Sequence, residues 1–358
     1  MKVFSRVWIL LFCVSLPVLA QQSSSTTAPA SKAAADNSNR QTTIDVVVDD
    51  KSQKPVPGLQ QQDFTLIDNG HPQPILSFEA ITSGATTRLN PPVEAIFVVD
   101  TVNENFEVLS RERQQLEKFF TQNGGQLPLP VRIAFFSHSE VKIQPTASRD
   151  GKTELDFLSQ NETELNVLTR DQGAIGAFDK IGRSLRALRT IGIQYLNTPG
   201  RKLLIWMSHG WPIPPAPTMD LDEKDKQQAF DTVVTIAGLM RLSRITVYSV
   251  DPSGNSSAGG LDSNRYKTFM NELKKPSQAE VGNTALQVTA IQTGGRIFIG
   301  GNDLVSQIES CIQDADAFYT ITFGIPRPAH PSEYHRIEVK VDKPGLTART
   351  RTMYYAQP

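Results

Sequence analysis

Serine, histidine and aspartate residues follow the apolar runs of this sequence at several points. Ser137-His138-Ser139 and Ser208-His209 come directly after such runs, as do Asp100 and Asp251. A serine hydrolase combines these residue types, with the nucleophile on a sharp turn from a strand into a helix, next to donors for an oxyanion. The sequence lacks the Gly-x-Ser-x-Gly motif of such a turn, and Ser and His are ordinary hydrogen-bonding residues in loops. We therefore expect no catalytic residue and keep a hydrolase as an alternative.

The composition excludes several other kinds of chemistry. The 358 residues include 36 Lys and Arg against 37 Asp and Glu, a balance that argues against a nucleic-acid binder with a basic surface. Only two cysteines are present, too few for a disulfide framework or for a site of several zinc-bound thiolates. With 39% hydrophobic and 20% charged residues, the chain has the composition of a globular protein.

The first residues have the pattern of a secretory signal peptide. Two basic residues precede the apolar run from Val7 to Leu16, and small residues lead up to Ala20. The run is shorter than the roughly 20 residues of a membrane span, so we expect cleavage after Ala20 and no stable membrane span afterwards. We therefore expect a secreted or periplasmic protein, with residues 1–20 as the signal peptide. Residues 21–41 contain no large apolar side chain and should form a disordered leader.

Both ends of the remaining chain have the pattern of β strands without intervening helices. Residues 42–90 contain Val- and Ile-rich stretches and the hairpin-type turn Asp68-Asn69-Gly70, so we expect a small β module there. Residues 316–358 contain three more strands, which should pair antiparallel because no helix separates them. These strands are Phe318–Gly324, Arg336–Val341 and Thr347–Tyr355. We hypothesise that the two β regions share one sheet, which makes the segment between them an insertion.

Apolar runs alternate with helical patterns in residues 91–315. Between the runs, apolar residues recur at three- and four-residue steps, as from Ile175 through Phe178 to Ile181, which indicates amphipathic helices. The runs are rich in β-branched residues, as strands buried on both faces are. They are Ala95–Val99, Val131–Phe136, Leu203–Met207 and Ile245–Val250. The alternation predicts an α/β fold with a doubly wound, mostly parallel sheet, flanked by antiparallel β strands at the N- and C-terminal ends.

The order of these elements resembles that of a von Willebrand factor type A domain. The matching order is a strand ending in Asp100, a helix, a strand, Thr169 before a helix, and a strand ending in Trp206-Met207-Ser208-His209-Gly210. The lead-in Val56-Pro57-Gly58-Leu59 is similar to that of secreted bacterial proteins related to this family. The resemblance covers about residues 42–356. It implies a Rossmann-like fold whose ligands lie at the carboxyl ends of the strands.

This resemblance also implies a divalent-cation site at the strand ends. The family builds the site from Asp-x-Ser-x-Ser after the first strand, a Thr from a later loop, and an Asp before Gly after the fourth strand, and such oxygen ligands suit Mg²⁺. Here Asp100 and Thr169 match, but Val102 and Glu104 replace the two Ser residues and His209 replaces the second Asp. We interpret the site as degenerate and without a cofactor, with Asp100 capping the next helix or bonding loop amides. The alternative is an unusual divalent-cation site, in which the imidazole favours Zn²⁺ or Mn²⁺. Its candidate ligands are Asp100, Asn103, Glu104, Thr169 and His209.

The segment Trp211–Pro217 is rich in proline and follows the fourth strand directly. An exposed aromatic side chain on such a stiff loop offers binding area at low entropic cost. The alternative is that Trp211 packs onto the domain and the prolines only set the path of the loop. Trp211 and the neighbouring Ser208 are our candidates for partner binding.

Together these features predict a secreted, non-enzymatic module for protein binding or adhesion. Its partner should be an extracellular or periplasmic protein, and we expect no nucleic-acid partner. Two alternatives stay open: a metal-assisted or Ser/His hydrolase at the same strand ends, and a structural envelope protein whose β flanks add strands to its neighbours.

Overall fold

A sheet of seven strands occupies the middle of the chain in the computed structural model, which describes residues 40–82, 93–138, 140–161, 173–213, 221–256 and 264–357. Five strands are parallel, in the order β11-β10-β9-β5-β6. They are β5 (Glu94–Asp100), β6 (Gln126–Phe136), β9 (Lys202–Met207), β10 (Ile245–Val250) and β11 (Ile297–Phe298). Two short strands, β7 (Val141–Ile143) and β8 (Ser148–Asp150), pair antiparallel with β6. The predicted mostly parallel sheet is therefore confirmed.

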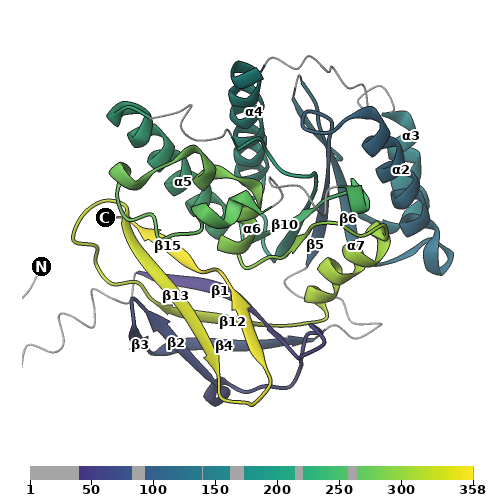
Figure 1. Cartoon of the computed structure of the whole chain (residues 1–358). Coiled ribbons are helices and arrows are strands. Elements are labelled where there is room, and N and C mark those ends of the chain that lie inside the picture. The colour runs from purple at the N-terminus through teal and green to yellow at the C-terminus, as the bar shows by residue number, and fades with distance from the viewer. Residues whose placement is uncertain are drawn as a thin grey trace, which may run out of the picture.

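Helices cover both faces of this sheet (Figure 1). One face packs against α2 (Phe106–Thr121), α3 (Gly151–Gln160) and α7 (Leu304–Ile312). The other packs against α4 (Gly173–Gln194), α5 (Glu223–Leu242) and α6 (Leu286–Gln292). Every residue of β9 and β10 is buried as a result, which is why apolar residues predominate in both strands.

Strands from both ends of the chain form two further antiparallel sheets below the α/β sheet (Figure 1). The first has the order β14-β1-β12-β4 and contains β1 (Gln41–Asp49), β4 (Ile75–Thr82), β12 (Ala317–Gly324) and β14 (Thr347–Thr350). The second has the order β15-β13-β2-β3 and contains β2 (Phe64–Asp68), β3 (His71–Gln73), β13 (Glu333–Val341) and β15 (Met353–Ala356). Phe64 and Tyr319 meet between the sheets, with ring centroids 4.9 Å apart, in a core of apolar side chains from both. We call these two sheets the sandwich.

The pairing of the two chain ends follows the sequence hypothesis, but the number of sheets does not. We expected one shared sheet, and the structure has two, because alternate side chains of these strands need a second layer to bury them. The expected strand Thr347–Tyr355 is also divided, at Arg351-Thr352, into β14 and β15, which join different sheets. The bounds of the two predicted β regions, residues 42–90 and 316–358, remain predictions.

Short 3₁₀ helices complete the described chain. They are η1 (Gln61–Asp63), η2 (Gln122–Gly125), η4 (Gly254–Ser256), η5 (Arg265–Phe269), η6 (Pro276–Gln278), η7 (Val281–Thr284) and η8 (Gln313–Ala315). The predicted signal peptide, and the predicted leader up to residue 39, lie outside the described residues. Among the helices that the structure describes, none has the length and apolar character needed to cross a bilayer.

Candidate functional site

The carboxyl ends of β5, β9 and β10 lie at one edge of the α/β sheet, which we call the strand-end edge. Asp100, Ser208-His209 and Asp251 are the residues at these ends. Backbone bonds tie the ends together: the Ser208 amide donates to Val250 O at 2.9 Å, and the Asp251 amide donates to Phe298 O at 2.9 Å. Asp100, Ser208-His209 and Asp251 therefore lie at one edge of the sheet, because each follows a strand of the parallel sheet.

Asp100 is fully buried, and its carboxylate accepts four hydrogen bonds from the chain. Oδ1 accepts from the amides of Val102 and Asn103 at 3.0 and 2.9 Å, and Oδ2 accepts from Asn103 Nδ2 at 2.7 Å and from Trp206 Nε1 at 2.8 Å. Burial raises the pKa of Asp100 above its ordinary value, and the bonds from Trp206 and Asn103 oppose that rise. A carboxylate has about four acceptor positions, so those of Asp100 are occupied by neutral donors of the protein itself.

Glu104 and His209 form a second contact at this edge. Glu104 Oε1 accepts from the backbone amide of His209 at 2.6 Å and lies 2.8 Å from His209 Nδ1. The Glu104 side chain is buried, whereas the His209 ring is 49% exposed. Burial lowers the pKa of His209, but the bond to Glu104 and the charges of Glu104, Asp251 and Asp100 outweigh it and raise the pKa above the ordinary value. His209 is thus an ionisable group that this edge presents to solvent.

The His209-Gly210 peptide is held in place by α6. Gln287 Nε2 donates to His209 O at 3.0 Å. Gly210 has a φ of +113°, and a Cβ there would lie 2.2 Å from Gln287 Nε2. Only glycine fits this turn, because a side chain would meet both the unfavourable φ and the amide of Gln287.

Glu112 is a buried acid that the sequence analysis did not single out. It lies on α2, is 1% exposed, and neither of its carboxylate oxygens has a hydrogen-bond partner among the described residues. Burial, followed by the charges of Glu104 and Asp100, raises the pKa of Glu112 well above its ordinary value. A signal was present in the sequence, because position 112 is three residues after Leu109 and four before Leu116, on the apolar stripe of the helix.

The described candidates for a cation site bond largely to one another, and one buried oxygen among them, Asn103 Oδ1, has no hydrogen-bond partner among the described residues. Asp100, Asn103, Glu104 and His209 do come together, but Asn103 turns its NH₂ group to Asp100 and His209 donates its amide to Glu104. Thr169 lies outside the described residues. Within the described ranges, no group of three or more His, Cys, Asp or Glu side chains is placed to hold a metal ion. These residues, as arranged here, do not fit a metal ion.

Neither predicted partner-binding residue is on the surface, which corrects our expectation of an exposed aromatic. Trp211 is 4% exposed and packs edge-on against Trp206, with ring centroids 5.3 Å apart. Ser208 is fully buried, and its hydroxyl accepts from the Gly210 amide at 3.1 Å. Burying the large apolar surface of an indole is favourable. Trp211 is therefore a core residue. Nor does Ser208 bond to His209, whose ring pairs with Glu104.

Three apolar side chains are instead exposed where helices begin at this edge. Phe106 is 74% exposed at the start of α2, where Asn105 caps the helix by accepting from the Val108 amide at 3.0 Å. Ile175 and Phe178 are 78% and 40% exposed in the first turns of α4. The sequence placed Ile175 and Phe178 on the apolar stripe of an amphipathic helix, and the structure leaves this first part of the stripe exposed, whereas Ile181 further along is buried. The periodicity shows which face of a helix is apolar but not where the sheet beneath it ends.

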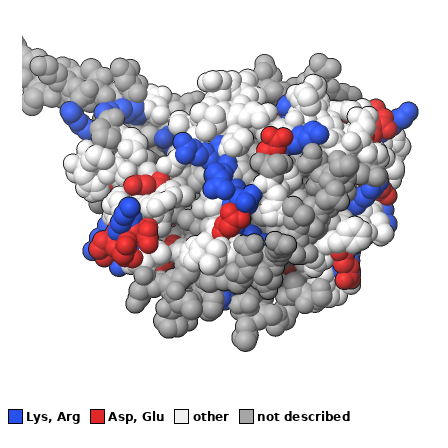
Figure 2. Space-filling view, turned by 90° about the horizontal axis from the view of Figure 1, so that it is seen from above, with Lys and Arg blue, Asp and Glu red and all other residues white. Residues whose placement is uncertain are grey.

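Figure 2 views the molecule from the side of this edge. In the described part of this face, basic and acidic side chains are interspersed with uncharged surface.

Comparisons with known proteins add little to these observations. No protein-family model and no curated protein sequence matches the chain. Among solved structures, human COPII-coat protein Sec24c is similar at 11% sequence identity and a TM-score of 0.31, over 78% of this chain and 46% of that one. The chain thus spans less than half the length of that protein, and a TM-score this low carries no argument about function. The fold description therefore rests on the strand order observed here.

Proposed function

We propose that this protein is secreted and non-enzymatic, and that a domain of the von Willebrand factor type A kind binds a partner protein at its strand-end edge. The observation that supports this function best is the exposure of Phe106, Ile175 and Phe178 at the helix starts of that edge. Large apolar side chains exposed close to one ligand-binding edge are typical of an interaction surface. The partner is an extracellular or periplasmic protein, because the signal-peptide pattern directs the chain out of the cytoplasm.

The polar residues of the same edge favour binding over a reaction. A catalytic nucleophile or base needs free lone pairs next to a site that substrate can reach. Asp100 is buried with its acceptor positions occupied, and Ser208 is buried with its hydroxyl bonded to the backbone. His209 is half exposed and positively charged in part of the pH range, so it offers the partner a donor beside the apolar side chains.

Surface substitutions test this function. The bait is the purified mature protein, and the sample is the extracellular or periplasmic fraction in which it occurs. We expect Phe106→Ser or Ile175→Ser to reduce recovery of the partner about tenfold, as the loss of an interface anchor worth about 1.4 kcal/mol does. Leu242→Ser is the matched control, because Leu242 is 59% exposed but ends α5 at the opposite side of the sheet.

Two results would contradict the proposal. Equal recovery of the partner with Phe106→Ser, Ile175→Ser and the Leu242→Ser control would show that the partner does not bind at this edge. Loss of binding in a chelator would show that a divalent cation takes part, against the degenerate-site interpretation. Trp211→Ala is not a useful probe of binding, because Trp211 is a core residue.

A further inference from the structure

Three arginines meet where the sandwich packs against the α/β domain. Arg241 and Arg244 lie at the end of α5 and just beyond it, and Arg351 lies in the link between β14 and β15. Together with Asp45 of β1 and Thr246 of β10, they line a cavity of about 20 Å³. These lining residues come from both parts of the molecule. We call this space the arginine cavity.

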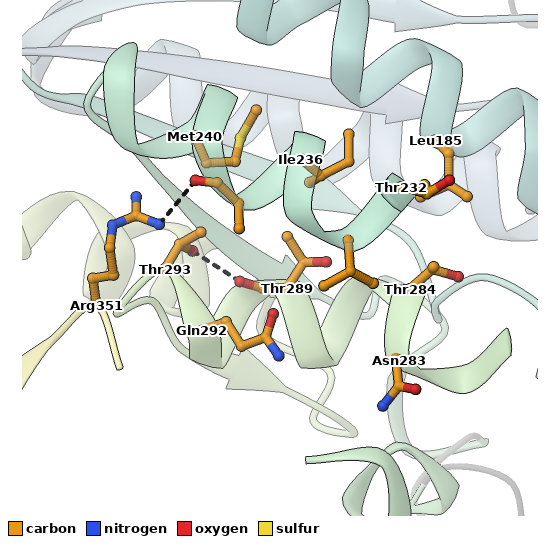
Figure 3. Close-up of a pocket in the computed structure, with 12 residues that line it drawn as sticks. Leu185, Thr232, Ile236, Met240, Asn283, Thr284, Thr289, Gln292, Thr293 and Arg351 are labelled. Carbon is orange, nitrogen blue, oxygen red and sulfur yellow. Dashed lines mark hydrogen bonds between the residues drawn. The ribbon is translucent and has the colours of Figure 1, made fainter. Parts of the chain in front are cut away.

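Arg351 is buried without an acidic partner. Its residue is 8% exposed, and its Nη1 donates to Ala237 O at a long 3.5 Å. Figure 3 shows the guanidinium entering from the strand link towards the carbonyl of α5, at one end of a neighbouring cavity of about 10 Å³ between α5 and α6. Within the described part of the chain, no carboxylate lies at ion-pair distance from Arg351. A guanidinium has five N–H donors, so most of those of Arg351 are without a strong acceptor.

The one carboxylate of the arginine cavity is already engaged. Asp45 pairs with Arg244 through both oxygens, and its Oδ1 also accepts from the Thr320 hydroxyl at 3.1 Å. Arg241 donates to the Thr42 hydroxyl at 3.0 Å, and the structure gives it no acidic partner among the described residues. The cavity therefore has three guanidinium groups around a single carboxylate.

This imbalance is energetically unfavourable for the chain alone. Arginine does not lose its proton in proteins, and an uncompensated buried charge costs several kcal/mol. Burial lowers the pKa of Arg241, and burial, together with the charge of Arg241 and against that of Asp45, lowers the pKa of Arg351 to about 9. In both cases burial is the main cause, and the charge of Asp45 only partly opposes it at Arg351.

Other arginines of this interface do have carboxylate partners, in contrast to Arg351. Arg349, two residues before Arg351, pairs with Asp314 at 2.7 Å and with Asp49 at 3.1 Å. Arg296 pairs with the same two carboxylates, at 3.3 and 2.8 Å. Two guanidiniums pair with two carboxylates in that cluster, and Arg201 beside them donates to Asp314 O at 2.7 Å.

We propose that the arginine cavity binds a small monovalent inorganic anion of the halide class, held between Arg351 and Arg241. A cavity of about 20 Å³ holds about one particle of the size of water, so a small anion fits it better than a phosphate monoester or an organic acid. Thr246 also lines the cavity and offers a hydroxyl as an additional donor. Because Arg351 belongs to the sandwich and Arg241 to α5, the anion links the two parts of the molecule.

Chloride-dependent thermal unfolding tests this site. The full mature protein is melted in sodium chloride and in sodium gluconate of equal ionic strength, gluconate being too large for the cavity. We expect Tm to rise by about 2 °C or more with chloride and to saturate, as specific binding to the folded state requires. Arg351→Met should abolish the rise. Arg336→Met is the control and should retain it, because Arg336 is an arginine of the sandwich whose side chain is 61% exposed.

A second measurement keeps the proposal testable if Arg351→Met does not fold. Crystals of the wild-type protein soaked in bromide should show an anomalous peak within hydrogen-bond distance of the Arg351 guanidinium. A Tm that is equal in chloride and gluconate, a chloride effect that persists in Arg351→Met, or bromide peaks only elsewhere would each overturn the proposal. None of these outcomes bears on partner binding at the strand-end edge, so the two proposals fail separately.

Discussion

The strand-end edge and the arginine cavity differ in how many hydrogen-bond partners they provide for a buried charged group. At the edge, the buried carboxylate of Asp100 is surrounded by neutral donors: two amides of its own loop, the amide group of Asn103 and the indole of Trp206. In the arginine cavity, two of three guanidiniums have only single neutral acceptors, Thr42 for Arg241 and Ala237 for Arg351. The Asp100 carboxylate has its acceptor positions filled without an ion, whereas Arg241 and Arg351 lack a carboxylate partner among the described residues.

This difference follows from what a local loop can supply. A turn after a strand provides backbone N–H groups that converge on a nearby carboxylate, because they are unpaired by the sheet. A guanidinium in a domain interface needs several acceptors in one plane, and carbonyls at helix ends seldom provide them. The resemblance to a cation-binding family predicts an ion at the edge, whereas the arginines without acidic partners lie at the other end of the α/β domain.

The largest effect should come from the ion cluster beside the arginine cavity. Asp314 is fully buried and accepts from Tyr248, Arg349 and Arg296 at 2.5, 2.7 and 3.3 Å. We expect Asp314→Ala to lower the free energy of unfolding by about 4 kcal/mol, because it leaves cations buried without their partner. Urea denaturation measures this. Asp303→Ala is the control: Asp303 is an exposed helix cap of α7, worth about 1 kcal/mol. A cost for Asp314→Ala as small as that of the control would mean that compensation of cations is unimportant at this interface.

A smaller cost is expected at the edge, where the donors are neutral. Asp100→Ala should lower the free energy of unfolding by about 3 kcal/mol, because four buried donors lose their acceptor but none of them carries a charge. Asp251→Ala is the matched control, since Asp251 follows β10 at the same edge and accepts from the Ser253 amide at 2.8 Å. If Asp100→Ala is instead tolerated, and Mg²⁺ raises the Tm of the wild type but not of the variant, the edge holds an ion after all.

The sequence predicts the regular parts of both regions and not their chemistry. Ala95–Val99 and Leu203–Met207 are buried strands of the parallel sheet, because an apolar run with helices on both sides has no other stable position. The gathering of Asp100 and His209 at one edge also follows, since parallel strands end together. What each side chain bonds to does not follow, because those partners are set by contacts between distant residues.

Two residues illustrate that limit. Trp211 has the sequence context of an exposed loop aromatic, yet Trp206 offers it a buried edge-on contact that no local pattern contains. Arg351 lies in the middle of a predicted strand, and its burial depends on how α5 and β1 meet after the whole chain has folded. Glu112 is the counterexample, because its place on the apolar stripe of α2 was readable in the sequence.

A buried acid outside both regions shows what happens when donors are lacking. Glu154 of α3 is fully buried, accepts one bond of 3.4 Å from Gln144, and leaves Oε2 without a partner. Burial raises its pKa from 4.5 to about 7. A raised folded-state pKa means that the stabilising contribution is present below pH 4.5 and is lost as the pH rises through about 7. We expect Glu154→Gln to remove this loss and to be more stable than the wild type by about 2 kcal/mol at pH 8, but not at pH 4. Equal stability of the two proteins at pH 8, measured by urea denaturation, would contradict this.

The smallest effect concerns the charge that the edge presents to solvent. The pKa of His209 is raised above 6.5, so its contribution to stability is present below that pH and is lost as the pH rises through the folded-state pKa. Because the ring is half exposed, water screens its interaction with Glu104, and we expect His209→Asn to cost only about 0.5 kcal/mol at pH 6. The cost should be smaller at pH 9. An NMR titration of the imidazole checks the cause, since Glu104→Gln removes the nearest charge and should move the His209 pKa back towards its ordinary value. A pKa unchanged by Glu104→Gln would mean that Glu104 orients the ring without holding its proton, and the edge would then present a neutral imidazole to its partner at physiological pH.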